Sequence, residues 1–416
     1  MFKNLKSIFN PKNKDIRSRI IFTLLALTIF AIGNTITVPG TKEITANLGF
    51  LEYLNAISGG GLKQFSIFGL GVMPYISASI VVGLLQMDII PYFSDLKNDG
   101  AKGRQKLNQI TRYMGIIVAF IQGVAMSIAF GISNNALDIM KTALIMTAGT
   151  AFLLWLGDRI TQKGIGNGIS LIIMAGIIST VPRMFIDAYT SLVSGASNTF
   201  IGVLSYGLFV IAYIAIIVGV IFMEMSERRI PIQYSNQTTS AYGARQTYIP
   251  FKLNSAGVMP VILASAVTSI ISLIASLVKN DSFTLFVEKY LSFTTPVGFV
   301  IYMLLIFVFG YFYTLIQANP EELSKNLSRN GGYIPGIRPG NETTVYVKNV
   351  LKRLALVGTT FLAVLAGMPI IFANISSLPT SVSIGGTGIL IVVGVALETY
   401  KQLESSLVNR TYKGRR

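Results

Sequence analysis

The stretch "GVMPYISASI" at positions 71–80 returns as "GVMPVILASA" at positions 257–266, and the two copies share Gly, Val, Met, Pro, Ile, Ala and Ser in register. Gly and Pro open each copy, where the fixed φ of proline and its missing N–H suit the first turn of a helix. One copy alone would be read as a proline tolerated in a membrane helix. The matched pair indicates that two parts of the chain are built alike.

The composition identifies a membrane protein, because 52% of the residues are hydrophobic, 12% are charged, and the mean hydropathy is +0.61. The chain has no cysteine and no histidine. This excludes disulfides, thiol nucleophiles, Ser-His pairs and the common zinc sites. No Gly-rich nucleotide-binding loop of the GxxxxGK[ST] type is present either. We therefore expect neither a catalytic site nor a metal or cofactor.

A membrane-crossing helix needs about 20 apolar residues, and ten such spans are found. They lie near 20–38, 70–87, 112–131, 142–158, 168–186, 203–223, 255–278, 297–318, 353–373 and 384–399. Apart from Arg183, near the end of the fifth, no charged residue lies in the middle of a span. Coupled carriers and intramembrane enzymes keep ionisable groups at depth, so the interior is predicted to be chemically inert.

The distribution of Lys and Arg predicts the orientation. With ten spans both chain ends share a side, and most of the 34 basic residues fall on it. The opposite side holds Lys42, Lys63, Lys141, Arg183, Lys279 and Lys289. Because basic residues accumulate in cytoplasmic loops, both termini are expected to be cytoplasmic. Two cytoplasmic loops, 226–254 and 319–350, are long enough to be candidate docking sites.

The doubled phrase opens the second span and the seventh. Because the two copies are five spans apart, they cross the membrane in opposite directions. This is typical of inverted structural repeats, whose functional site lies between the two halves. The expected organisation is a cytoplasmic segment 1–19, halves at 20–190 and 200–400, and a cytoplasmic tail 401–416.

Just before the first copy, the stretch "SGGGLKQFSIFGLG" at 58–71 contains a Gly-bounded apolar segment too short to cross the membrane. It is expected to be a short re-entrant helix, which is tolerated only inside protein or a water-filled cavity.

Several further motifs resemble the SecY family, the channel subunit of the bacterial Sec translocon. They are "LLQMDIIP" at 84–91, "GRQKLNQITRY" at 103–113, "GTAFLLWLGDRIT" at 149–161, "GIGNGIS" at 164–170, "ERRIPIQY" at 227–234, "NSAGVMPVI" at 254–262 and "GYIPGIRPG" at 332–340. The resemblance runs from the first span to the last. It implies an all-α, ten-helix clamshell with two inverted five-helix halves in the bacterial cell membrane.

The resemblance also implies roles for particular residues. Helices 2 and 7, which start at Pro74 and Pro260, would form a lateral gate that releases transmembrane segments into the bilayer. The re-entrant segment, near 58–69, would be the plug that packs inside the closed pore, with Gly59, Gly60, Gly61, Leu62, Phe65, Ile67 and Phe68. The repeat makes Ile76 and Ile262 equivalent, and the family pattern extends them to an apolar pore ring of Ile76, Ile80, Ile173, Ile177, Ile262 and Ile391.

The partners follow from the same resemblance. They are SecE and SecG in a heterotrimer, the SecA ATPase, the ribosome through its rRNA phosphates, signal peptides and nascent polypeptides, and the lipid bilayer. The residues expected to dock the motor and the ribosome are Arg228, Arg229, Arg245 and Arg338.

Two other classes remain open from the residues alone. A small-solute secondary transporter would also use inverted repeats, but it needs a compact polar site at the midplane, and none stands out. A membrane-embedded enzyme would need the catalytic groups that the composition excludes.

Overall fold

The computed structural model describes residues 14–41, 52–86, 90–131, 135–194, 199–234, 247–278, 281–291, 295–317, 320–375 and 380–413. Within these ranges ten helices overlap the ten predicted spans. They are α2 (Lys14–Thr35), α4 (Met73–Leu85), α6 (Gly100–Ala129), α7 (Ala136–Lys163), α8 (Gly168–Tyr189), α9 (Thr199–Met225), α10 (Met259–Val278), α12 (Pro296–Gln317), α14 (Asn341–Ile375) and α15 (Thr380–Lys413). The predicted all-α membrane fold is confirmed.

Length and apolar character support membrane crossing. Seven helices of the described part are long and apolar enough to span, and Met73–Leu85 and Met259–Ser272 are shorter apolar helices. The outward faces carry large apolar side chains, such as Leu25 at 59% and Ile211 at 68% exposure. Contiguous apolar surface of this kind requires a non-aqueous environment, here the lipid.

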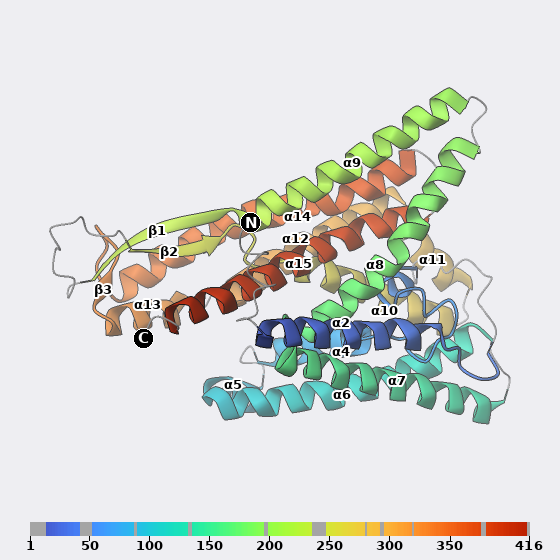
Figure 1. The fold of residues 1–416 in the computed structure, drawn as a ribbon, viewed down its shortest axis with the longest axis horizontal. Helices are drawn as coiled ribbons and strands as arrows, with labels where there is room; N and C mark the ends of the chain where they lie inside the picture. The colour runs from blue at the N-terminus through green and yellow to red at the C-terminus, as the bar shows by residue number, and fades with distance from the viewer. Residues whose placement is uncertain are drawn as a thin grey trace.

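The helices lie roughly side by side, and the strands gather at one end of the molecule (Figure 1). The start of α2, the end of α15 and the short helices α5 (Pro91–Asn98) and α13 (Pro320–Arg329) all lie toward that end. The end of α6 and the start of α9 lie at the other. The first described helix therefore begins on the same side on which the last one ends. This is the arrangement expected from an even number of spans.

Packing between helices repeats along the chain. In the first part α4 packs on α6, α6 on α7, and α7 on α8. In the second part α10 packs on α12, α12 on α14, and α14 on α15. The two sets join where α15 packs on α8 and where α10 contacts α4 and α6.

The two long loops form one small body beyond the membrane helices. Strand β1 (Glu227–Tyr234) pairs antiparallel with β2 (Thr247–Lys252), and its far end pairs with β3 (Gly332–Tyr333) from the other loop. The sheet buries its apolar side chains against α13 and the start of α14. That core consists of Ile230, Ile232, Phe251, Leu327, Ile334, Val347 and Leu351. The loops had been predicted as separate docking sites, so their union in one sheet is new.

The remaining elements are short. Helix α3 (Glu52–Ile57) precedes the predicted re-entrant segment, a π-helical turn η3 (Thr190–Ser194) ends α8, and α11 (Asp281–Leu291) lies between α10 and α12.

Candidate functional site

The two Gly-Val-Met-Pro copies adopt the same backbone conformation. Gly71 and Gly257 both lie in the left-handed region, with φ of +57° and +62°, where only glycine is free of steric cost. Each turn leads directly into a helix, α4 at Met73 and α10 at Met259. Pro74 and Pro260 therefore both occupy the second helical position, and both are buried.

The carbonyl of each of these glycines accepts a hydrogen bond from a side chain. Thr150 Oγ1, on α7, donates to Gly71 O at 3.1 Å. Asn254 Nδ2 donates to Gly257 O at 3.1 Å and also to Glu224 Oε1 at 2.7 Å. Asn254, which is only 4% exposed, thereby ties the end of α9 to the turn before α10. Sequence reasoning singled out neither Thr150 nor Asn254, although Asn254 opens the motif "NSAGVMPVI".

The isoleucines predicted to be equivalent occupy equivalent places. The backbone N–H of Ile76 donates to Val72 O at 3.2 Å, and that of Ile262 donates to Val258 O at 3.4 Å. Both side chains are buried, at 7% and 4% exposure. The first turn of each helix therefore presents an isoleucine to the same buried cluster.

That cluster contains the whole predicted ring. Its buried members include Ile76, Ile173, Ile177, Ile262 and Ile391, with Ile80 packed against it. The residues come from four helices, α4, α8, α10 and α15. The approach of α15 to α8 is close, because a Cβ at Gly388 would lie 2.7 Å from Ile177 Cγ2. The structure places the six isoleucines in or against one large buried core, and the expectation that they encircle a pore stays a prediction.

The predicted plug segment differs from expectation in its helix. Residues 58–69 form successive turns, and the helical part is α3, which ends just before them. Positive φ at Gly59 and Gly60, of +73° and +86°, ends the helix there because right-handed helices need negative φ. Helix α3 contacts α8, α10 and α15, and its Ile57 belongs to the isoleucine cluster.

The first apolar side chains after the three glycines are buried. Leu62 and Phe65 are each 1% exposed, in a second cluster with Met126 of α6 and Met146 of α7. Their segment is bridged to the chain after α2, where Thr37 pairs with Ser66, and this pairing draws them away from the isoleucines. The expectation that they pack inside the pore stays a prediction.

Phe68 and Ile67 remain closer to the isoleucines. Phe68 stacks between Phe30 of α2 and Phe152 of α7, with ring centroids 6.2 and 5.8 Å apart. It still belongs to the isoleucine cluster, and Ile67 packs against that cluster. Residues 62–69 thus form an anchored stem, and α3 with its following turn is the part in contact with the helices that carry the isoleucines.

The predicted docking arginines are exposed on the small sheet and its neighbour loop. Arg228 and Arg229 lie on β1, and the guanidinium of Arg229 lies 4.7 Å from the centre of the Tyr248 ring. Arg338 is exposed in the turn after β3, where its carbonyl accepts a hydrogen bond from Thr343 Oγ1 at 2.9 Å. Arg245 lies outside the described residues.

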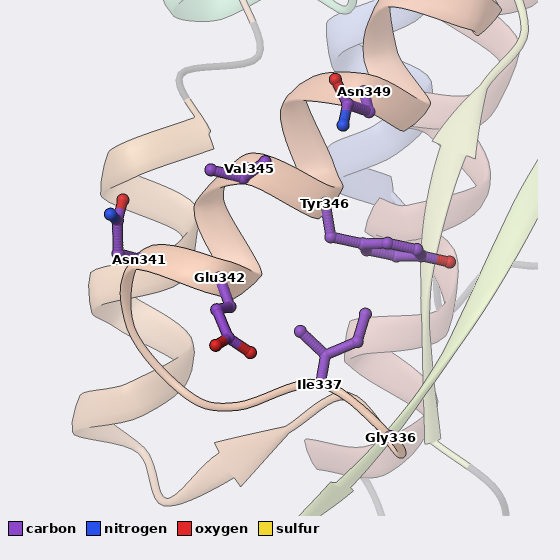
Figure 2. Close-up of a pocket in the computed structure, with 7 residues that line it drawn as sticks. All are labelled: Gly336, Ile337, Asn341, Glu342, Val345, Tyr346 and Asn349. Carbon is purple, nitrogen blue, oxygen red and sulfur yellow. The ribbon is translucent and has the colours of Figure 1, made fainter.

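A shallow depression of about 400 Å³ adjoins Arg338. Figure 2 shows it beside the first turns of α14, with the Ile337, Glu342 and Tyr346 side chains around one space. Its lining is completed by Gly336, Asn341, Val345 and Asn349. The depression therefore combines apolar surface with the carboxylate of Glu342.

Comparison with known proteins agrees with this architecture. The family model SecY matches residues 66–400. The chain is 46% identical to the protein translocase subunit SecY of Bacillus subtilis strain 168, over 100% of this chain and 99% of the relative. It is 43% identical to the subunit of the same name from Staphylococcus carnosus strain TM300, with the same coverage.

Solved structures share the fold. A protein-conducting channel aligns with a TM-score of 0.70 at 21% identity, covering 94% of this chain and 93% of the other. Sec61 from a canine ribosome-channel complex aligns with a TM-score of 0.67, at the same identity and coverage. With a family model over most of its length and full-length relatives above 40% identity, the chain belongs to the SecY family.

Proposed function

We propose that this chain is the central protein-conducting channel of a Sec translocon. It passes unfolded secretory proteins across the membrane and releases transmembrane segments sideways into the bilayer. The proposal is supported by full-length relatives named protein translocase subunit SecY. Family membership also disfavours the alternative of a small-solute transporter.

The observation that carries the proposal is that isoleucines from four helices share one buried apolar core, where α8 contacts α15 and α4 contacts α10. An apolar constriction excludes ions by dewetting. It also offers a passing polypeptide no hydrogen-bonding groups that would hold it. In this proposal the cluster is the closed pore ring, and α3 with its following turn seals it as the plug.

The lateral gate is proposed to lie between α4 and α10. These helices start from the two equivalent turns and contact one another directly. Neither carries a charged residue within its described span. Parting them would therefore expose an apolar seam, through which a hydrophobic signal peptide or nascent membrane segment reaches the lipid.

Partners supply the energy, because the chain has no nucleotide-binding loop. We propose that SecA and the ribosome dock on the sheet body, where Arg228, Arg229 and Arg338 are exposed. Arginine forms paired hydrogen bonds with carboxylates and phosphates. SecE and SecG are the proposed membrane partners, in a bacterial cell membrane with the sheet body and both termini in the cytoplasm.

Ion leakage tests the function. The full-length chain is reconstituted into liposomes with the small membrane subunits that copurify with it, and a variant lacking residues 52–61 is compared. We expect the deletion to raise ion flux strongly, because it removes the proposed seal while leaving the stem anchored. A carrier would not become leaky, so a deletion variant that inserts normally and remains ion-tight would overturn the channel assignment.

A further inference from the structure

Asn34 joins both ends of the turn that follows α3. It lies at the end of α2 and is 8% exposed. Its Nδ2 donates to Gly59 O at 2.7 Å, and its Oδ1 accepts a hydrogen bond from Ser66 Oγ at 3.1 Å. Ser66 itself is fully buried. One amide thus satisfies both a backbone carbonyl next to the plug helix and a hydroxyl in the stem.

The glycines around this amide leave the room that it needs. A Cβ at Gly61 would lie 2.0 Å from Asn34 Oδ1, and a Cβ at Gly59 would lie 2.9 Å from Asn34 Nδ2. Neither distance is compatible with a larger residue in the present arrangement. The glycine run therefore shapes a seat for the Asn34 side chain.

The backbone of the stem is held in a conformation that it would not adopt alone. Phe65 has φ of +46°, the left-handed region that is costly for a bulky residue. Such strain persists only where surrounding contacts impose it. Here the chain beyond α2 imposes it, because Val38 N donates to Phe65 O at 2.8 Å and Ile67 N donates to Ile36 O at 2.9 Å.

Other contacts to the turn are weaker. Ser179 Oγ of α8 reaches Gly59 O at 3.4 Å, while it donates to Gly176 O of its own helix at 2.7 Å. Asn55 of α3 is joined to the stem, since its Oδ1 accepts a hydrogen bond from Lys63 N at 2.9 Å, but this bond does not reach a membrane helix. Asn34 provides the shortest hydrogen bond between the turn and a membrane helix.

We propose that Asn34 is a latch that holds the plug in its seat: Ser66 in the anchored stem orients the amide, and gating requires the hydrogen bond from Asn34 to Gly59 to break. The inference rests on the proposed channel function and deepens it. When the plug leaves, Gly59 O meets water, so the latch stabilises only the seated state. A residue that stabilises one of two states more than the other shifts their populations by the difference between the two stabilisation free energies.

The test uses the absence of native cysteine. Ala56 of α3 packs against the isoleucine cluster, and an Ala56→Cys chain carries a single thiol whose labelling by a membrane-impermeant maleimide reports unseating. Asn34→Ala is expected to raise the labelling rate and the ion flux by roughly 5- to 150-fold, the range for losing buried hydrogen bonds. Ser66→Ala removes one partner and is expected to give a smaller rise.

The control is Thr35→Ala. Thr35 is the exposed neighbour of Asn34, and its hydroxyl donates to Ile32 O of its own helix, so both readouts should stay at the parental level. In the variant lacking residues 52–61, Asn34→Ala should add no further ion flux, because the latched element is gone. A general destabilisation would add flux in both backgrounds.

The outcomes separate the two proposals. If Asn34→Ala and Ser66→Ala leave labelling and flux unchanged while the 52–61 deletion leaks, the latch is refuted and the channel stands. If the deletion does not leak, the channel assignment fails. Should Asn34→Ala fail to insert, Ser66→Ala decides alone, and parental labelling in that variant refutes the latch.

Discussion

Replacing Ile391 by asparagine is expected to bias the channel toward its open state. Ile391 is 1% exposed within the isoleucine cluster, and burying such a side chain contributes about 1.5–3 kcal/mol. An amide in its place also lacks partners in an apolar cluster, which costs about 1–3 kcal/mol. The sum, about 2.5–6 kcal/mol, disfavours the closed state, because in a hydrated pore the amide meets water. Since about 1.4 kcal/mol corresponds to a factor of ten in an equilibrium constant, the ratio of closed to open channels should fall more than tenfold.

Two assays report this shift. Ion flux into liposomes should rise, and export of a reporter with a defective signal sequence should recover in cells. Ile262→Asn should have the same two effects, because Ile262 is 4% exposed in the same cluster. The matched control is Ile178→Asn, which alters the neighbour of Ile177 on α8 at a position that is 47% exposed. If both buried variants stay ion-tight and reject defective signals, these residues line no pore and the cluster is only a packing core.

Two further predictions concern the sheet body and the repeated turns. Arg338→Glu should slow export by at least about tenfold, because a like-charge contact with a carboxylate or phosphate partner costs several kcal/mol. The Arg338→Glu protein should still insert and fold. The control Lys352→Glu, on the exposed face of α14, should slow export less. Normal export from the Arg338→Glu variant would mean that Arg338 serves only to set the membrane topology. Gly257→Ala should lower the free energy of unfolding by about 1–2 kcal/mol, since the site has open space but φ of +62°. Gly207→Ala, at an open site within α9, should not lower it, and equal denaturation midpoints in detergent for the two variants would contradict the backbone argument.

The sequence predicted those parts of the fold that depend on local pattern. Each of the ten predicted apolar spans overlaps a helix, and the doubled Gly-Val-Met-Pro phrase correctly predicted two equivalent helix starts, at Met73 and Met259. A left-handed glycine before a proline-led helix is a local requirement, so it is visible in the residues themselves.

Features that depend on distant pairing were missed. Strand β3 pairs with β1 through Gln233 and Tyr333, about a hundred positions apart, and no local pattern links two residues of one chain over that distance. Asn34 lacks any distinguishing signal in its own helix, because its partners lie on the turns after α3. The short helix expected near 58–69 is not found there, because these residues form turns and the helix α3 ends at Ile57. The positive φ at Phe65 is imposed by the pairing with the chain after α2.

The small sheet connects the loop that carries Arg338 to the membrane helices α9 and α10. Strand β1 begins two residues after α9 ends, and β2 ends seven residues before α10 begins, so both strands are rooted at membrane helices by short connections. Strand β3 joins the turn that carries Arg338 to the end of β1 that lies farthest from α9. A load applied to Arg338 is therefore carried along β1 and β2 to the base of α10, where Asn254 joins Glu224 to Gly257. A partner bound at Arg338 would thereby tilt α10, one of the two proposed gate helices, from the far end of the sheet without touching the membrane.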